Sequence, residues 1–121
     1  MSTETILIAG MIIMLILAAL SLYIRMQNMA ELLYLFLSVL VDKTFNYTYY
    51  RNNLIKSKFE RREIRVDEYN QEIEKSKKIE KTLNVINAEF TKIAMMATKS
   101  NIHPKEVIFK KYPEFRDIYN F

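Results

Sequence analysis

The sequence predicts an all-α protein: an N-terminal single transmembrane helix, a membrane-proximal apolar helix that continues it, and then a small cytoplasmic helical bundle or short coiled coil. Three observations lead to this prediction. Residues 6–24 form an uncharged apolar run, no glycine or proline occurs between Gly10 and Pro104, and apolar residues recur at helical spacing from Ile79 onward. We predict a membrane anchor at residues 1–24 and a membrane-proximal apolar helix at residues 25–42. A basic and aromatic juxtamembrane segment follows at residues 43–66. Residues 67–121 are expected to form a helical cytoplasmic domain with short C-terminal helices.

The apolar run from Ile6 to Ile24 is long enough to cross a bilayer. As a helix it is about 28 Å long, close to the roughly 30 Å hydrocarbon core. Its Leu and Ile residues together favour insertion by roughly 3 to 7 kcal/mol. The alternative, a buried helix of a soluble core, needs more surrounding chain than this protein has. The residues expected to lie in the membrane include Ile6, Leu7, Ile13, Leu17, Leu20 and Ile24.

The residues around this run predict an uncleaved anchor whose N-terminus lies outside. A secretory signal peptide has a basic start and a shorter apolar core, whereas the five residues before Ile6 contain Glu4 and no Lys or Arg. All 18 Lys and Arg residues follow the run, beginning at Arg25. The positive-inside bias therefore places the bulk of the chain in the cytoplasm. The absence of cysteine fits that reducing compartment.

A second apolar stretch, Leu32 to Val41, follows closely. Counted from Met29, it gives about 20 Å of helix, which is too short to cross a bilayer. Glu31 and Asp42 at its edges each oppose insertion by up to about 3 kcal/mol. We therefore expect the first helix to continue and to hold this stretch at or above the interface. Re-entry or a second span is the alternative.

This extension is apolar around its whole circumference, so something must cover it. Lipid headgroups, later helices of the same chain, sibling copies and a different subunit are the candidates. Further on, apolar residues from Ile79 to Ala97 follow a heptad pattern, although Glu72 and Ser76 occupy core positions upstream. This pattern fits both an intramolecular bundle and a homo-oligomeric coiled coil. The predicted partner interface consists of Leu33, Phe36, Leu37, Leu40, Leu83, Ile86, Phe90 and Ile93.

Positive charge is concentrated in residues 43–66, which contain seven basic and two acidic residues. Tyrosines followed by basic residues suit the cytoplasmic leaflet, where each cation contributes about 1 kcal/mol. The alternative is a nucleic-acid site, in which bases stack on tyrosines and phosphates contact arginines. The expected contacts with a membrane surface or a nucleic acid are Arg51, Lys56, Lys58, Arg61, Arg62 and Arg65.

The C-terminal tail predicts two short helices. Pro104 suits the first turn of a helix that Asn101 or His103 precedes and that Lys110 and Lys111 close. Pro113 ends this helix and starts a last short turn. The aromatic residues at this terminus predict that it docks on another surface.

Composition argues against an enzyme. The absence of cysteine excludes thiol nucleophiles and thiolate metal sites, and His103 is the only histidine. The single glycine, Gly10, lies in the apolar run and leaves none for a phosphate-binding loop. We therefore expect no catalytic activity, cofactor, metal site or small-molecule substrate.

These observations predict a non-enzymatic single-pass membrane anchor, a scaffold or an accessory subunit of a larger membrane complex. Its expected partners are the lipid bilayer and other protein subunits or further copies of the chain. One alternative is a membrane-tethered nucleic-acid organiser, of the kind some phages use to hold replicating DNA at the membrane. Another is a small holin-like protein that disrupts the membrane, which requires residues 32–41 to insert.

Overall fold

A single long helix runs along the whole length of the molecule. The computed structural model describes residues 2–121 as five α-helices without a strand, and α1 (Thr3–Glu60) alone has 58 residues. Such a helix is about 87 Å long. Ser2 caps its start, because the Ser2 hydroxyl accepts a hydrogen bond from the Thr5 N–H at 3.2 Å. As predicted, the helix continues through Arg25, with no turn between the two apolar stretches.

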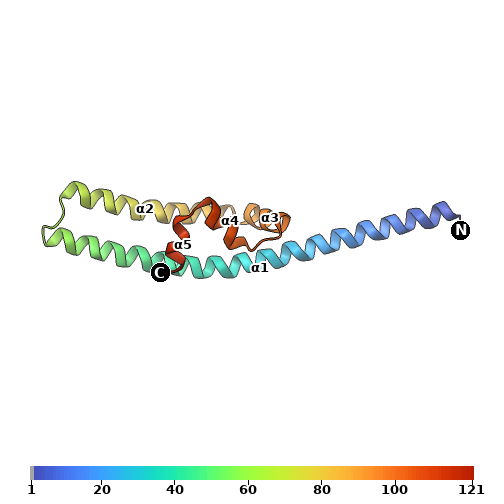
Figure 1. Cartoon of the computed structure of the whole chain (residues 1–121), viewed down its shortest axis with the longest axis horizontal. Coiled ribbons are helices and arrows are strands. Elements are labelled where there is room, and N and C mark those ends of the chain that lie inside the picture. Colours follow the sequence, from blue (N-terminus) through green and yellow to red (C-terminus); the bar gives the residue numbers. More distant parts are fainter. Residues whose placement is uncertain (1) are drawn as a thin grey trace.

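The second helix returns antiparallel to the C-terminal half of α1 (Figure 1). The turn between them contains Arg62, which adopts the left-handed conformation with φ 58°. α2 (Val66–Ala88) is followed by α3 (Phe90–Ser100) after a break of one residue. At that break the Glu89 N–H is shared between the Val85 carbonyl at 3.0 Å and the Ile86 carbonyl at 3.1 Å, a bifurcated hydrogen bond common at helix ends.

Two short helices complete the chain as the sequence predicted. α4 (Pro104–Lys111) begins after His103, whose Nδ1 accepts a hydrogen bond from the Lys105 N–H at 3.0 Å. α5 (Glu114–Tyr119) follows Pro113. The tail docks on α1: the Tyr119 ring lies 5.2 Å from that of Phe36, centroid to centroid.

The core lies between α1 and the later helices. Residues 33–40 of α1, about two helical turns, supply one wall, and α2 to α5 supply the other. The heptad positions predicted between Ile79 and Ala97 face this core. Its buried members are Leu33, Phe36, Leu37, Leu40, Leu83, Ile86, Ile93, Ala94, Ala97, Val107, Ile108, Phe109, Phe115 and Ile118.

A polar layer replaces the apolar core towards the α1–α2 turn. The Arg51 guanidinium pairs with the Glu72 carboxylate and donates to the Glu72 carbonyl and to Ser76 Oγ, each at 3.1 Å. One turn away, Thr48 Oγ1 lies 3.3 Å from Glu80 Oε1. Glu72 and Ser76 thus occupy the inner positions that the heptad pattern assigned to them, and Arg51 satisfies their polar groups.

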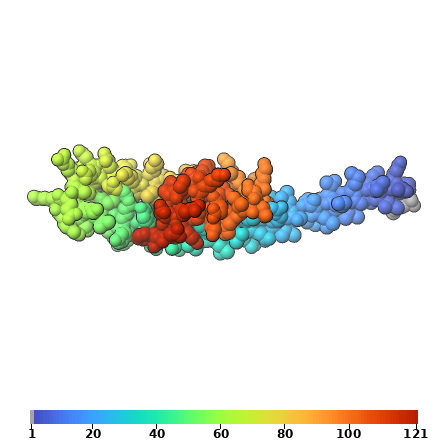
Figure 2. Space-filling model, viewed as in Figure 1, coloured from blue at the N-terminus to red at the C-terminus, as the bar shows by residue number. Residues whose placement is uncertain are grey.

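The N-terminal end of α1 extends beyond the other helices. Residues 2–24 have exposed side chains, and the space-filling view shows this end as a bare rod (Figure 2). Among the described residues, α1 is the one helix long and apolar enough to span a membrane. We call residues 6–24 the apolar span and residues 25–121 the helical body.

Candidate membrane and partner surfaces

The apolar span has no protein around it. None of its most hydrophobic 18-residue window is buried, and Leu15 is 68% exposed. All six residues predicted to lie in the membrane are among these exposed side chains: Ile6, Leu7, Ile13, Leu17, Leu20 and Ile24. A continuous apolar surface of this size is costly in water and requires another apolar phase or a partner.

The span meets the helical body at Arg25. Its Nη2 donates to the Thr98 carbonyl at 3.1 Å, near the C-terminal end of α3. That carbonyl belongs to the last turn of α3 and also accepts the Asn101 N–H at 3.3 Å. Arg25 therefore fastens α3 to α1 immediately after the apolar span.

The residues predicted to form a partner interface lie instead in the chain's own core. Leu33 and Leu40 are 0% exposed, and Phe90 packs partly buried against the same cluster. The remaining members are also buried: Phe36, Leu37, Leu83, Ile86 and Ile93. The later helices of the same chain cover this face of α1, so these side chains offer no free surface to another protein.

Between Glu31 and Asp42, apolar side chains of α1 outside the core remain exposed: Leu32, Tyr34, Leu35 and Val39. Leu32, Leu35 and Val39 recur at spacings of three and four, so they form one stripe on the helix surface. Leu35 is 62% exposed, and the other two are also exposed. We call these three residues the outer patch. Glu31 and Asp42 border it and are exposed to solvent.

The sequence contained a weak signal for this division. In residues 32–41 nearly every position is apolar, so periodicity alone does not tell an inward stripe from an outward one. The polar residues on either side of the stretch, Asn28 and Asn46, fall on the same side of the helix as Leu35. Extending the helix in both directions would have marked that side as the outer face.

Arg51 is not available to a membrane or a nucleic acid. Its guanidinium is held between α1 and α2 by Glu72 and Ser76. The other five predicted contacts are exposed and lie around the α1–α2 turn, and we call them the hairpin tip: Lys56, Lys58, Arg61, Arg62 and Arg65. Among these, Arg61 has a loose ion pair with Glu63 at 3.8 Å.

The hairpin tip lies far from the apolar span. Because α1 is continuous, Lys58 is roughly 50 Å along the helix axis from Ile24. Figure 1 shows this turn at the end of the molecule opposite the N-terminus. With α1 upright in a bilayer, the tip is several Debye lengths from the surface. The predicted contact of these residues with the membrane surface is therefore incompatible with an upright α1.

The titratable groups with shifted pKa values have structural roles. A hydrogen bond from Lys75 and the ion pair with Arg51 lower the pKa of Glu72. Burial lowers the pKa of His103, with Lys105 adding to the effect. A hydrogen bond with Glu89 raises the pKa of Lys111. Within residues 2–121 no cluster of His, Asp or Glu is arranged to hold a metal ion.

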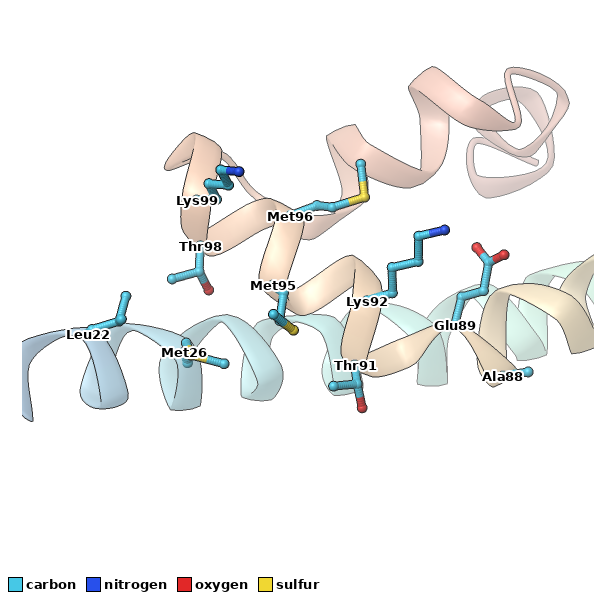
Figure 3. Close-up of a pocket in the computed structure, with 10 residues that line it drawn as sticks. All are labelled: Leu22, Met26, Ala88, Glu89, Thr91, Lys92, Met95, Met96, Thr98 and Lys99. Atoms are coloured by element: carbon cyan, nitrogen blue, oxygen red, sulfur yellow. The ribbon is translucent and has the colours of Figure 1, made fainter. Parts of the chain in front are cut away.

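A groove lies where the apolar span enters the helical body (Figure 3). Its volume is about 790 Å³, and Leu22 and Met26 of α1 form one side of it. α3 forms the other side with Met95, and Lys92 and Lys99 lie along its rim. We call this the membrane-side groove. Comparison of the chain with protein families, curated proteins and solved structures found no match.

Proposed function

We propose that this protein is a non-enzymatic, single-pass membrane anchor that holds a helical hairpin in the cytoplasm as a scaffold or accessory subunit of a membrane complex. One observation carries the proposal. The same continuous helix presents the uncovered apolar span and, beyond it, the outer patch. The span is suited to lipid, and the outer patch is suited to a protein partner.

The apolar span is the part of the chain that we expect to lie in the bilayer. The apolar span matches the hydrocarbon core in length and contains no charge, so a bilayer stabilises it without any unpaired group. We expect the full-length protein to remain in the membrane pellet after alkaline carbonate extraction. Leu15→Lys and Leu17→Lys together place two charges near mid-membrane and should release it. Lys77→Leu and Lys78→Leu together are the control and should not change the fractionation.

The orientation follows from the basic residues, all of which lie beyond the apolar span. The chain lacks cysteine, so a single introduced cysteine reports one position. In intact cells an impermeant maleimide should label Thr3→Cys directly and Lys58→Cys only after lysis. The reverse pattern would contradict the proposed topology.

The second part of the proposal concerns the outer patch. A partner helix that packs on Leu32, Leu35 and Val39 would cover them as the later helices cover the inner face of α1. Other subunits or further copies of the chain are the expected partners. We expect Leu35→Glu with Val39→Glu to reduce the mass of the gently solubilised assembly and to leave the helical content unchanged. An unchanged mass would contradict a role of the outer patch in assembly.

A second candidate function is a membrane-tethered nucleic-acid organiser. The hairpin tip favours it, because five exposed basic residues lie roughly 50 Å from the apolar span, clear of the membrane surface. We would test DNA binding by the full-length protein in nanodiscs over a range of salt concentrations. Binding that falls steeply with salt and disappears in Arg61→Glu, Arg62→Glu, Arg65→Glu would support this function. Lys77→Glu, Lys78→Glu, Lys81→Glu is the charge-matched control.

The holin-like alternative has less support. It requires residues 32–41 to insert, yet Leu33, Phe36, Leu37 and Leu40 hold the core together. Insertion would therefore separate α1 from α2 to α5. We expect an impermeant reagent to label cysteines at positions 28 and 43 from the same side of the membrane.

A further inference from the structure

The membrane-side groove lies at the level where the apolar span ends. Leu22 belongs to the span, and Met26 lies half a turn beyond its last residue, Ile24. Along the α1 axis these two side chains are therefore within about 3 Å of the end of the span. With the span in a bilayer, this is the level of the glycerol and phosphate groups of one leaflet.

The inside of the groove is apolar and open. Met95 is 54% exposed, and in Figure 3 it points from α3 towards α1, where Met26 lies on the facing turns. Methionine side chains are flexible and adapt to irregular apolar ligands. Leu22 is also exposed, and its surface continues into the apolar span. A flexible hydrocarbon chain could thus enter the groove from the bilayer without leaving apolar surroundings.

The rim of the groove is positively charged. Lys92 and Lys99 are seven residues apart, so they lie on one face of α3, about 10 Å apart along its axis. Neither forms an ion pair with an acidic side chain in the described part of the chain. Glu89, the one carboxylate that lines the groove, is paired with Lys111 at 3.1 Å.

We propose that the membrane-side groove binds an anionic phospholipid of the surrounding bilayer, with an acyl chain along Leu22, Met26 and Met95 and the phosphate near Lys92 and Lys99. This inference rests on the proposed membrane anchoring. An anionic headgroup is favoured because two unpaired cations rim the groove, and each contributes about 1 kcal/mol near a negative lipid surface. The aliphatic part of a lysine side chain can lie along an apolar surface while its ammonium group reaches a lipid headgroup. Lys92 and Lys99 at the rim of the groove would need this arrangement.

Tryptophan fluorescence provides the test, because the chain contains no tryptophan. The Met95→Trp protein would be reconstituted into vesicles with equal fractions of acyl-brominated phosphatidylglycerol or acyl-brominated phosphatidylcholine. We expect quenching at least twofold stronger by the brominated phosphatidylglycerol. Lys92→Gln with Lys99→Gln should make the two lipids equivalent. Lys78→Gln with Lys81→Gln removes the same charge from exposed residues of α2 and should preserve the difference.

Further reporters separate the failure of this inference from the failure of the anchor. Leu15→Trp should be quenched by both lipids if the span is in the bilayer, and its protection from both would contradict the proposed anchoring. If both lipids quench Leu15→Trp but quench Met95→Trp equally, the span lies in the bilayer and the groove does not select an anionic lipid. That result would overturn the proposed lipid site and leave the proposed anchoring intact. Protection of Met95→Trp from quenching by both lipids in an oligomer would also overturn the lipid site, because a second copy of the chain would then fill the groove. Met96→Trp is a second reporter if Met95→Trp disturbs the fold.

Discussion

At the residue scale, a few polar side chains fix how the helices align. Arg51 makes contacts with both the backbone and the side chains of α2, so one register of the two helices satisfies all of them. Unpaired polar groups are costly when buried, and a shift of α2 along α1 would leave Ser76 without its partner. The polar layer thus complements the apolar core, which is less sensitive to register.

We expect Arg51→Ala to lower the free energy of unfolding by about 1 to 3 kcal/mol, because it removes three hydrogen-bonding contacts and leaves Ser76 buried without a partner. Arg65→Ala is the control, since Arg65 is exposed, and it should change stability by less than about 0.5 kcal/mol. Urea unfolding in detergent, followed by circular dichroism, measures both. Equal losses of stability in Arg51→Ala and Arg65→Ala would contradict a stabilising role of the Arg51 contacts in the polar layer.

His103 makes stability depend on pH. Its Nδ1 must be unprotonated to accept the Lys105 N–H, and burial lowers its pKa in the folded protein below the usual value of about 6.5. Because the folded pKa is the lower one, the contribution of neutral His103 is fully present above pH ~6.5 and is lost as the pH falls towards the folded pKa. We expect a lower melting temperature at pH 5.5 than at pH 7.5.

The variant His103→Asn separates this effect from other groups. Asparagine also caps helices but does not titrate in this range, so the variant should melt with a smaller difference between the two pH values. Glu72 does not interfere, since its pKa is lowered from 4.5 and its contribution is lost only at more acidic pH. An unchanged pH dependence in the variant would show that another group causes it.

At the element scale, α1 changes its role along its length. The side chains of its first part are exposed, its middle part contributes one wall of the core, and its last part pairs with α2 through polar groups. The absence of glycine and proline between Gly10 and Pro104 allowed the sequence to predict a continuous helix. The starts of the two short helices, at Pro104 and after Pro113, were also predictable, because proline acts on the residues next to it.

The inner and outer faces of residues 32–41 were not predictable in the same way. Leu35 and Leu40 are chemically alike, and no polar pattern within residues 32–41 distinguishes them; the only sequence signal is that Asn28 and Asn46, outside the stretch, fall on the side of Leu35. The position of the hairpin tip was missed for a related reason. The composition of residues 43–66 resembles a membrane-surface segment, but the length of the uninterrupted helix carries its basic end far from the apolar span.

Two leucines of α1 test this division. Leu40→Ala removes a fully buried side chain and should lower the free energy of unfolding by about 2 to 5 kcal/mol. Leu35→Ala removes an exposed side chain of the same size and should change it by less than about 0.5 kcal/mol in the monomer. Thermal unfolding of the detergent-solubilised monomer measures both. A larger loss of stability in Leu35→Ala than in Leu40→Ala would contradict the assignment of Leu40 to the inner face and Leu35 to the outer face.

At the scale of the whole molecule, the protein is a rod with an apolar end and a basic end, and a compact helical body lies between them (Figure 1). Arg25 fastens the body to α1 at the end of the apolar span. This arrangement places the membrane-side groove at the end of the span and separates both from the outer patch, which lies on another face of α1, and from the hairpin tip. Each surface can therefore be changed by mutation without disturbing the others.

In the proposed topology, hydrocarbon surrounds the apolar span while the continuous α1 holds the hairpin tip in water. Spin labels on single cysteines at positions 15, 28 and 58 of the protein in nanodiscs test it most directly, through their accessibility to oxygen and to a water-soluble nickel complex. We predict that the label at 15 favours oxygen and that the labels at 28 and 58 favour nickel. High nickel accessibility at position 15, or a label at 58 that favours oxygen, would rule out this topology.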